Sequence, residues 1–229
     1  MDNASTFIRI FKEFEDWMGK KTKKTGYVGF SDMLHELKGQ HGLIQGNVQF
    51  LQKMAEVRNV ITHNKDILIQ PTDQVVEQFR TLIALITKPP GLLQYCAKNP
   101  TTVSEEEFLP GVLRQMGAHD YSQIIVRGEK KYRLLSREGV SKWIEANIEN
   151  DLVSIGDTKV ADVLAHEDEG TCEFVGRNTD VFVFLELLSD PKRRIQAVII
   201  TERGRPNEKP LGIATAWDAG AIIKELSIA

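Results

Sequence analysis

Six consecutive residues, Arg58-Asn59-Val60-Ile61-Thr62-His63, carry side chains suited to phosphodiester chemistry. The imidazole of His63 has an ordinary pKa of about 6.5 and can act as a general acid or base. The guanidinium of Arg58 can donate two parallel hydrogen bonds to a phosphate and stabilise developing negative charge. Asn59 precedes His63 by four residues, so on a helix its amide is placed to hold the imidazole or the phosphate.

The residues before His63 have the periodicity of an amphipathic helix. Apolar residues fall in one sector of a helical wheel, and polar residues fall on the opposite side. The apolar set is Phe50, Leu51, Met54, Val57 and Ile61, and the polar set is Gln52, Glu56, Asn59 and His63. An ordinary solvent-exposed helix face containing one histidine would show the same pattern.

In this helical setting the sequence resembles the HEPN superfamily, whose signature commonly reads Arg-Asn-x-x-x-His. The resemblance covers roughly residues 4–88 and implies a metal-independent endoribonuclease with Arg58, Asn59 and His63 as catalytic residues. It also implies a homodimer in which two motifs meet at the two-fold axis. RNA supplies its own 2′-hydroxyl nucleophile, so a proton-transfer group and a cation suffice, and no catalytic cofactor or metal is expected. Family association further suggests a toxin-like protein with an antitoxin partner.

Residues 1–90 are predicted to form an antiparallel all-α bundle of four helices. Apolar residues recur at helical spacing in four segments, and no strand pattern separates them. Pro71-Thr72 opens the last segment, and Pro89-Pro90-Gly91 ends it. The prolines therefore mark a domain boundary.

Residues 91–229 change to β-branched runs that alternate with amphipathic segments, which indicates an α/β unit. The pattern occurs twice, at about 95–150 and 151–226. Three blocks of the first half are matched in order with three of the second. The pairs are 102–104 with 178–180, 123–126 with 196–199, and 134–139 with 213–218. The predicted fold class is therefore α+β multidomain, with a helical bundle followed by a tandem α/β module.

The second half ends in Gly212-Ile213-Ala214-Thr215-Ala216-Trp217-Asp218. Thr215 and Asp218 have the spacing of a capping box, which a helix start uses without any ligand. In a tandem repeat, however, this ending resembles paired CBS domains, the Bateman module. The resemblance implies an adenine-nucleotide pocket in which Thr215 lies near the phosphates and Asp218 accepts from the ribose. The other residues it assigns to the pocket are Gly212, Ile213 and Arg194.

The first repeat departs from this pattern. Ser136 matches Thr215, but Gly139 stands where the carboxylate is expected and Arg133 stands where the glycine is expected. One pocket per chain is therefore predicted. AMP, ADP, ATP and S-adenosylmethionine all remain open as the regulatory ligand.

The bulk composition bounds the partners and the compartment. The net charge is −3, distributed as +2 over residues 1–90 and −5 over the rest, which argues against indiscriminate nucleic-acid binding. The two cysteines are far apart in the sequence and fit free thiols in a reducing compartment. No secretion signal or membrane span is apparent, so a cytoplasmic location is expected.

The sequence therefore favours an endoribonuclease whose homodimer is regulated by an adenine nucleotide bound to its CBS pair. The main alternative is a non-catalytic nucleotide sensor whose helical domain serves as a dimerisation or partner-docking module. Transfer of a nucleotide to a partner is a weaker alternative, because no glycine-rich phosphate loop with a lysine is present.

Overall fold

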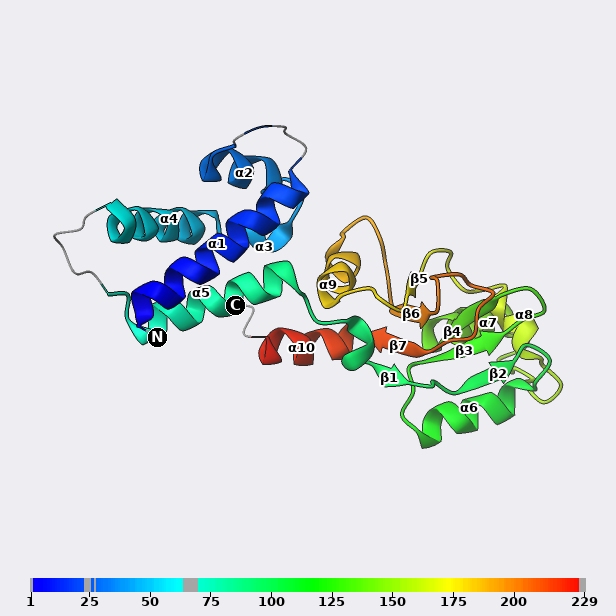
Figure 1. Cartoon of the computed structure of the whole chain (residues 1–229). Helices are drawn as coiled ribbons and strands as arrows, with labels where there is room; N and C mark the ends of the chain where they lie inside the picture. The colour runs from blue at the N-terminus through cyan, green and yellow to red at the C-terminus, as the bar shows by residue number, and fades with distance from the viewer. Residues whose placement is uncertain (1, 23–25, 27, 64–69, 227–229) are drawn as a thin grey trace. The chain divides into compact units, whose positions relative to one another are not determined.

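The computed structural model describes residues 2–22, 26, 28–63 and 70–226. The chain divides into two compact units, Met1–Pro89 and Pro90–Ala229. Figure 1 shows that the described elements of the first unit are helices, whereas the second contains two sheets with flanking helices. None of the helices within the described ranges is long and apolar enough to cross a bilayer.

The first unit contains five described helices, one more than predicted. They are α1 (Asn3–Lys21), α2 (Phe30–Leu37), α3 (Gly42–Gly46), α4 (Val48–His63) and α5 (Asp73–Thr87). The additional helix, α3, is a single short turn that buries Ile44 and contains two glycines, so the periodicity of its sequence is too brief to detect.

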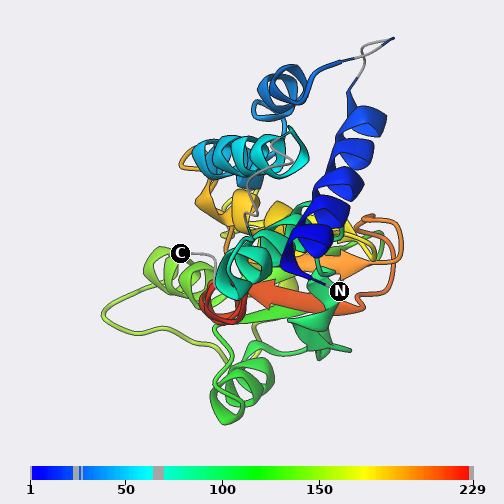
Figure 2. The same ribbon diagram turned by 60° about the vertical axis from the view of Figure 1, so that its left-hand side comes forward.

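Aromatic side chains from α1 and α5 form the centre of this unit. Phe7 and Phe79 are fully buried with ring centroids 5.0 Å apart, and Phe11 lies 6.0 Å from Phe79. The two helices lie alongside each other in both views (Figure 1 and Figure 2). Asp2 and Thr72 cap their N-termini by accepting hydrogen bonds from Ser5 and Val75. The start predicted at Pro71-Thr72 is therefore confirmed.

The second unit contains two copies of a strand–helix–strand–strand–helix motif. The first copy consists of β2 (Thr102–Ser104), α6 (Leu109–Ala118), β3 (Gln123–Arg127), β4 (Tyr132–Ser136) and α7 (Arg137–Ala146). The second consists of β5 (Cys172–Gly176), α9 (Val181–Ser189), β6 (Ala197–Thr201), β7 (Gly212–Thr215) and α10 (Ala216–Glu225).

Both copies have the same sheet topology. The first two strands of each copy pair in parallel, and the last two pair antiparallel. A short strand, β1 (Ala97–Lys98), adds to β7, which extends the second sheet to the order β1-β7-β6-β5. The predicted tandem α/β repeat is therefore confirmed.

One block of the sequence alignment between the repeats was wrong. Residues 178–180 were matched to the strand at 102–104, but they form the turn before α9, and the equivalent strand is β5 at Cys172–Gly176. The parallel ladder of β5 with β6 corrects the register. The alternation of β5 is weak because all five of its residues are only half-buried.

Each repeat is completed by a short helix that precedes the other one. Leu92 of η1 (Leu92–Gln94), ahead of the first repeat, packs into the core of the second, which contains Phe184 and Val198. Conversely, α8 (Val160–Leu164), ahead of the second repeat, packs into the core of the first. A separate apolar cluster joins the sheets through Ile125 and Ile199. The two repeats therefore depend on each other for their cores.

Candidate functional site

The polar stripe predicted on α4 is present in the structure. Gln52, Glu56, Asn59 and His63 are all exposed, whereas Leu51 and Met54 are buried on the opposite face. His63 is the last residue of α4, and no hydrogen bond or ion pair is described for it within the described parts of the chain.

Arg58 is held by two side chains of α1, Glu15 and Phe11, which were not predicted to belong to the site. Its Nη2 atom lies 2.7 Å from Oε1 of Glu15 on α1, and its guanidinium lies 5.1 Å from the centroid of the Phe11 ring. The side chains of Arg58 and Glu15 are only 30% and 25% exposed. The helix pattern of α4 alone contained no signal for Glu15, because the two residues are 43 positions apart.

The side chain of Asn59 is hydrogen bonded to Arg58 in this structure. Its Oδ1 atom accepts a hydrogen bond of 3.0 Å from Nη1 of Arg58. The expectation that the Asn59 amide orients His63 therefore differs from the observed contact. The adjacent side chain satisfies the amide oxygen, and the guanidinium is fixed from both sides.

A cavity of about 410 Å³ borders this cluster. It is lined by residues from α1, from α2 and from the chain between them, together with Arg58. Its charged lining residues are Glu15, Asp16, Lys20 and Arg58, so the positive charges are balanced. His63 is not among its lining residues. The guanidinium of Arg58 is already paired with Glu15, which weakens its attraction for a phosphate in this cavity.

The second predicted site lies where β7 runs into α10. The N–H of Thr215 donates to Oδ2 of Asp218 at 2.7 Å, as in the capping box expected from their spacing, and the Thr215 hydroxyl donates to the same atom at 3.2 Å. Both hydrogen bonds use the same oxygen. The other oxygen, Oδ1, accepts no hydrogen bond from the residues that the structure describes.

Gly212 is buried, and the space beside its Cα atom is filled by neighbouring side chains. A Cβ atom at this position would lie 2.6 Å from Sγ of Cys96 and 3.0 Å from Leu93. The glycine is therefore needed for the close approach of the segment preceding β1. Ile213 packs against the cluster between the two sheets.

Arg194 is exposed and lies three residues before β6 begins at Ala197. The Lys142 ammonium, which donates to Asp168, and more weakly the charge of Arg194 lower the pKa of the Asp168 carboxyl. Arg194 therefore contributes positive charge on this side of the unit, although no direct contact with Thr215 or Asp218 is described.

Trp217 is a further functional candidate, which was not predicted from the sequence. It lies between Thr215 and Asp218 in the first turn of α10, and it is 88% exposed. An exposed indole combines a large apolar face with one N–H donor, so it can serve as a binding surface. The sequence feature that could have identified Trp217 is its position within the segment from Gly212 to Asp218.

The equivalent junction of the first repeat, between β4 and α7, is closed by Glu167. The N–H of Ser136 donates to Oε1 of Glu167 at 2.6 Å, and the Ser136 hydroxyl lies 2.9 Å from Oε2. The same hydroxyl accepts from the N–H of Gly139 at 3.0 Å. Burial raises the pKa of the Glu167 carboxyl, and the hydrogen bonds from Ser136 offset only part of this increase.

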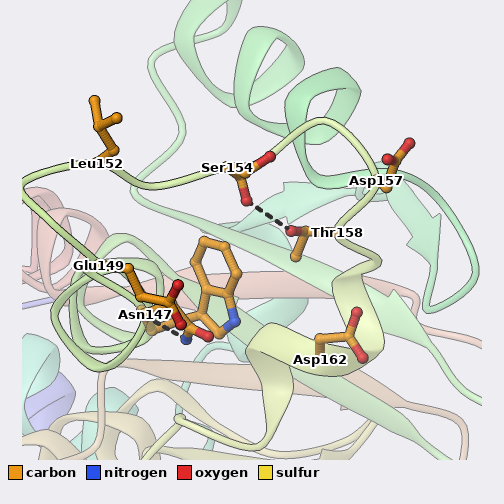
Figure 3. A pocket seen from close by; sticks show the side chains of 8 residues that line it. Asn147, Glu149, Leu152, Ser154, Asp157, Thr158 and Asp162 are labelled. Carbon is orange, nitrogen blue, oxygen red and sulfur yellow. Dashed lines mark hydrogen bonds between the residues drawn. The ribbon is translucent and has the colours of Figure 1, made fainter.

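A larger cavity, of about 590 Å³, lies near the C-terminal end of α7 (Figure 3). Glu149, Asp157 and Asp162 are among its lining residues, and no lysine or arginine lines it. Thr158 closes one side through a hydrogen bond of 3.5 Å to the carbonyl of Ser154 (Figure 3). Three carboxylates without a cation repel a phosphate, so this cavity does not suit a nucleotide.

Comparisons with known proteins gave similarities to solved structures alone. No family model matches the sequence, and no curated protein matches it. A putative acetoin utilization protein from Vibrio cholerae is 16% identical, with 60% of this chain and 93% of that chain covered and a TM-score of 0.48. CbpB in complex with c-di-AMP is 13% identical, with coverages of 69% and 96% and a TM-score of 0.47. CBSX2 in complex with AMP is 12% identical, with coverages of 60% and 98% and a TM-score of 0.44. Similarity at this level does not carry a ligand over to this chain.

Proposed function

We propose that the chain is an adenine-nucleotide sensor, in which residues 90–229 act as a CBS pair and bind the nucleotide at the β7–α10 junction. The helical unit is then the module that responds, by dimerisation or by docking a partner. One observation carries the proposal. Trp217, with 88% of its surface exposed, stands between Thr215 and Asp218 at the start of a ten-residue helix.

Each part of a nucleotide has a suitable group at this junction. The unpaired N–H groups and the dipole of the α10 N-terminus favour a phosphate. The free Oδ1 atom of Asp218 can accept a hydrogen bond from a ribose hydroxyl. The indole of Trp217 offers a flat face for the adenine, a contact worth about 1–3 kcal/mol in proteins that stack bases.

Titration calorimetry with AMP, ATP and c-di-AMP tests this proposal. AMP and c-di-AMP are included because two of the similar structures contain them. We expect binding of at least one of these nucleotides, weakened tenfold or more by Asp218→Ala and by Trp217→Ala. Asp162→Ala is the matched control, because Asp162 also accepts from a helix-capping N–H, that of Lys159 at 3.0 Å. Unchanged affinity in both junction variants would exclude this site.

A second candidate function is metal-independent RNA cleavage by a homodimer at Arg58, Asn59 and His63. The supporting observation is that Arg58 and Asn59 are hydrogen bonded to each other on the same helix whose exposed face carries His63. In the proposed dimer, a second copy brings the matching residues to one scissile linkage, and the nucleotide-bound pair regulates their alignment.

Incubation of the protein with total RNA and EDTA, with and without nucleotide, tests this second function. His63→Ala is expected to abolish cleavage without unfolding the protein. His35→Ala is the matched control, since His35 is another exposed histidine of the helical unit. RNA that stays intact with the wild-type protein under every nucleotide condition leaves the sensor as the function. An antitoxin-like partner would be sought only if cleavage is observed.

A further inference from the structure

At the start of α7, the side chain of Glu167 fills the space that a side chain at position 139 would need. A Cβ atom added to Gly139 would overlap the Oε1 and Cδ atoms of Glu167 and would lie 2.9 Å from its Oε2 atom. The φ angle of Gly139 is not positive, so its backbone conformation is open to any residue. The neighbouring carboxylate, and not the backbone, therefore requires glycine here.

The two strand–helix junctions make the same hydrogen bonds with carboxylates from different places. In the second repeat, Asp218 comes from the third residue of the helix and accepts from the N–H and hydroxyl of Thr215. In the first, Ser136 makes the same pair of donations to Glu167, which is 31 residues away in the sequence. Gly139 occupies the position of Asp218.

The segment that carries Glu167 is also held by a neighbouring ion pair. Asp168 lies 2.5 Å from Nζ of Lys142 on α7, and Lys142 in turn lies 3.1 Å from Glu138. Two consecutive carboxylates therefore attach the chain after α8 to the first turns of α7.

We propose that Glu167 determines the ligand stoichiometry of the pair: it supplies the missing carboxylate of the first repeat from outside the helix and so closes that junction to an anionic ligand. Both oxygens of Glu167 accept from Ser136, so neither is left for a ribose hydroxyl. At the second junction Asp218 accepts from Thr215 through Oδ2 alone, which leaves Oδ1 for a ligand. The statement about ligands depends on the proposed nucleotide function, whereas the exchange of carboxylates does not.

A set of four variants tests the exchange by thermal unfolding. Glu167→Ala and Gly139→Ala are each expected to lower the midpoint by several degrees, because each removes the carboxylate from Ser136. The unfolding midpoint of the Gly139→Ala/Glu167→Ala double variant is expected to be no lower than that of the less stable single variant. Gly139→Asp/Glu167→Ala is expected to recover most of the loss, because the new aspartate restores the arrangement seen at Asp218. Gly220→Ala in α10 is the matched control, since a Cβ there meets nothing within 4 Å.

Strictly additive losses in the double variant, or no recovery with Gly139→Asp, would overturn the exchange. If Glu167→Ala does not fold, Glu167→Ser takes its place in the same set, since its short side chain also withdraws the carboxylate from Ser136.

Calorimetry with AMP then tests the stoichiometry. The wild type is expected to bind one AMP per chain, and Gly139→Asp/Glu167→Ala is expected to bind two. If folded Gly139→Asp/Glu167→Ala binds only one AMP per chain, the role assigned to Glu167 is refuted. If the wild type binds none of AMP, ATP and c-di-AMP while the unfolding midpoint still recovers, the nucleotide function is refuted and the exchange of carboxylates stands.

Discussion

The guanidinium of Arg58 on α4 is paired with the carboxylate of Glu15 on α1 at 2.7 Å, with both side chains less than one-third exposed. This ion pair connects the predicted catalytic motif on α4 to α1, one of the two helices at the centre of the bundle. Arg58 consequently contributes to the packing of the unit, and its availability to a phosphate depends on Glu15.

Glu15→Gln is expected to release Arg58 at a modest cost in stability. The loss is about 0.5–1.5 kcal/mol in the free energy of unfolding, because one ionic partner is replaced by a neutral acceptor of the same shape. Any affinity of the helical unit for RNA or inorganic phosphate is expected to increase, since the guanidinium charge is no longer neutralised. Denaturant unfolding and a salt-dependent binding titration measure the two effects. Glu13→Gln, which removes the exposed partner of Arg9, is the control.

Glu167 is expected to make stability depend on pH with a defined sign. Its pKa in the folded protein is raised above the ordinary value of 4.5, so folding favours the protonated carboxyl. The contribution of this group is therefore complete below 4.5 and is lost as the pH rises through the folded pKa. The side chain of Glu167→Gln does not titrate. As the pH rises across this window, the unfolding midpoint of the variant should therefore increase relative to that of the wild type. Parallel curves for the two proteins would contradict the prediction.

Both cysteines are expected to react slowly in the native protein. Burial raises the pKa values of Cys96 and Cys172 to about 11. Since the thiolate is the reactive form, alkylation near neutral pH should be about a hundredfold slower than for an ordinary thiol. The native rate should continue to increase beyond pH 10 instead of levelling off near 9. The same protein in denaturant, which should react at the ordinary rate, provides the control.

Gly212→Ala is expected to destabilise the second unit by about 1–3 kcal/mol through overpacking. The added Cβ would meet Sγ of Cys96 at 2.6 Å and the carbonyl oxygen of Ala97 at 3.3 Å. Gly212→Ala/Cys96→Ala should recover part of this loss, since it removes the nearer atom. Full stability of the single variant would show that the segment before β1 moves away without cost.

The sequence by itself was sufficient for features that depend on neighbours along the chain. The helical period predicted the buried and exposed faces of α4, the spacing of Thr215 and Asp218 predicted their capping box, and Thr72 was placed at a helix start. These features arise within one or two turns of a helix, where residue spacing determines which side chains meet.

Tertiary structure alone decided which distant side chains share one place. Glu15 reaches Arg58 across 43 residues, Glu167 reaches Ser136 across 31, and Cys96 fills the space beside Gly212. In each case a residue that the sequence singled out as catalytic, as a mismatch or as a pocket glycine lies against a partner from another element. Such pairs depend on how strands and helices pack, and the periodicity of a single segment contains no information about that packing.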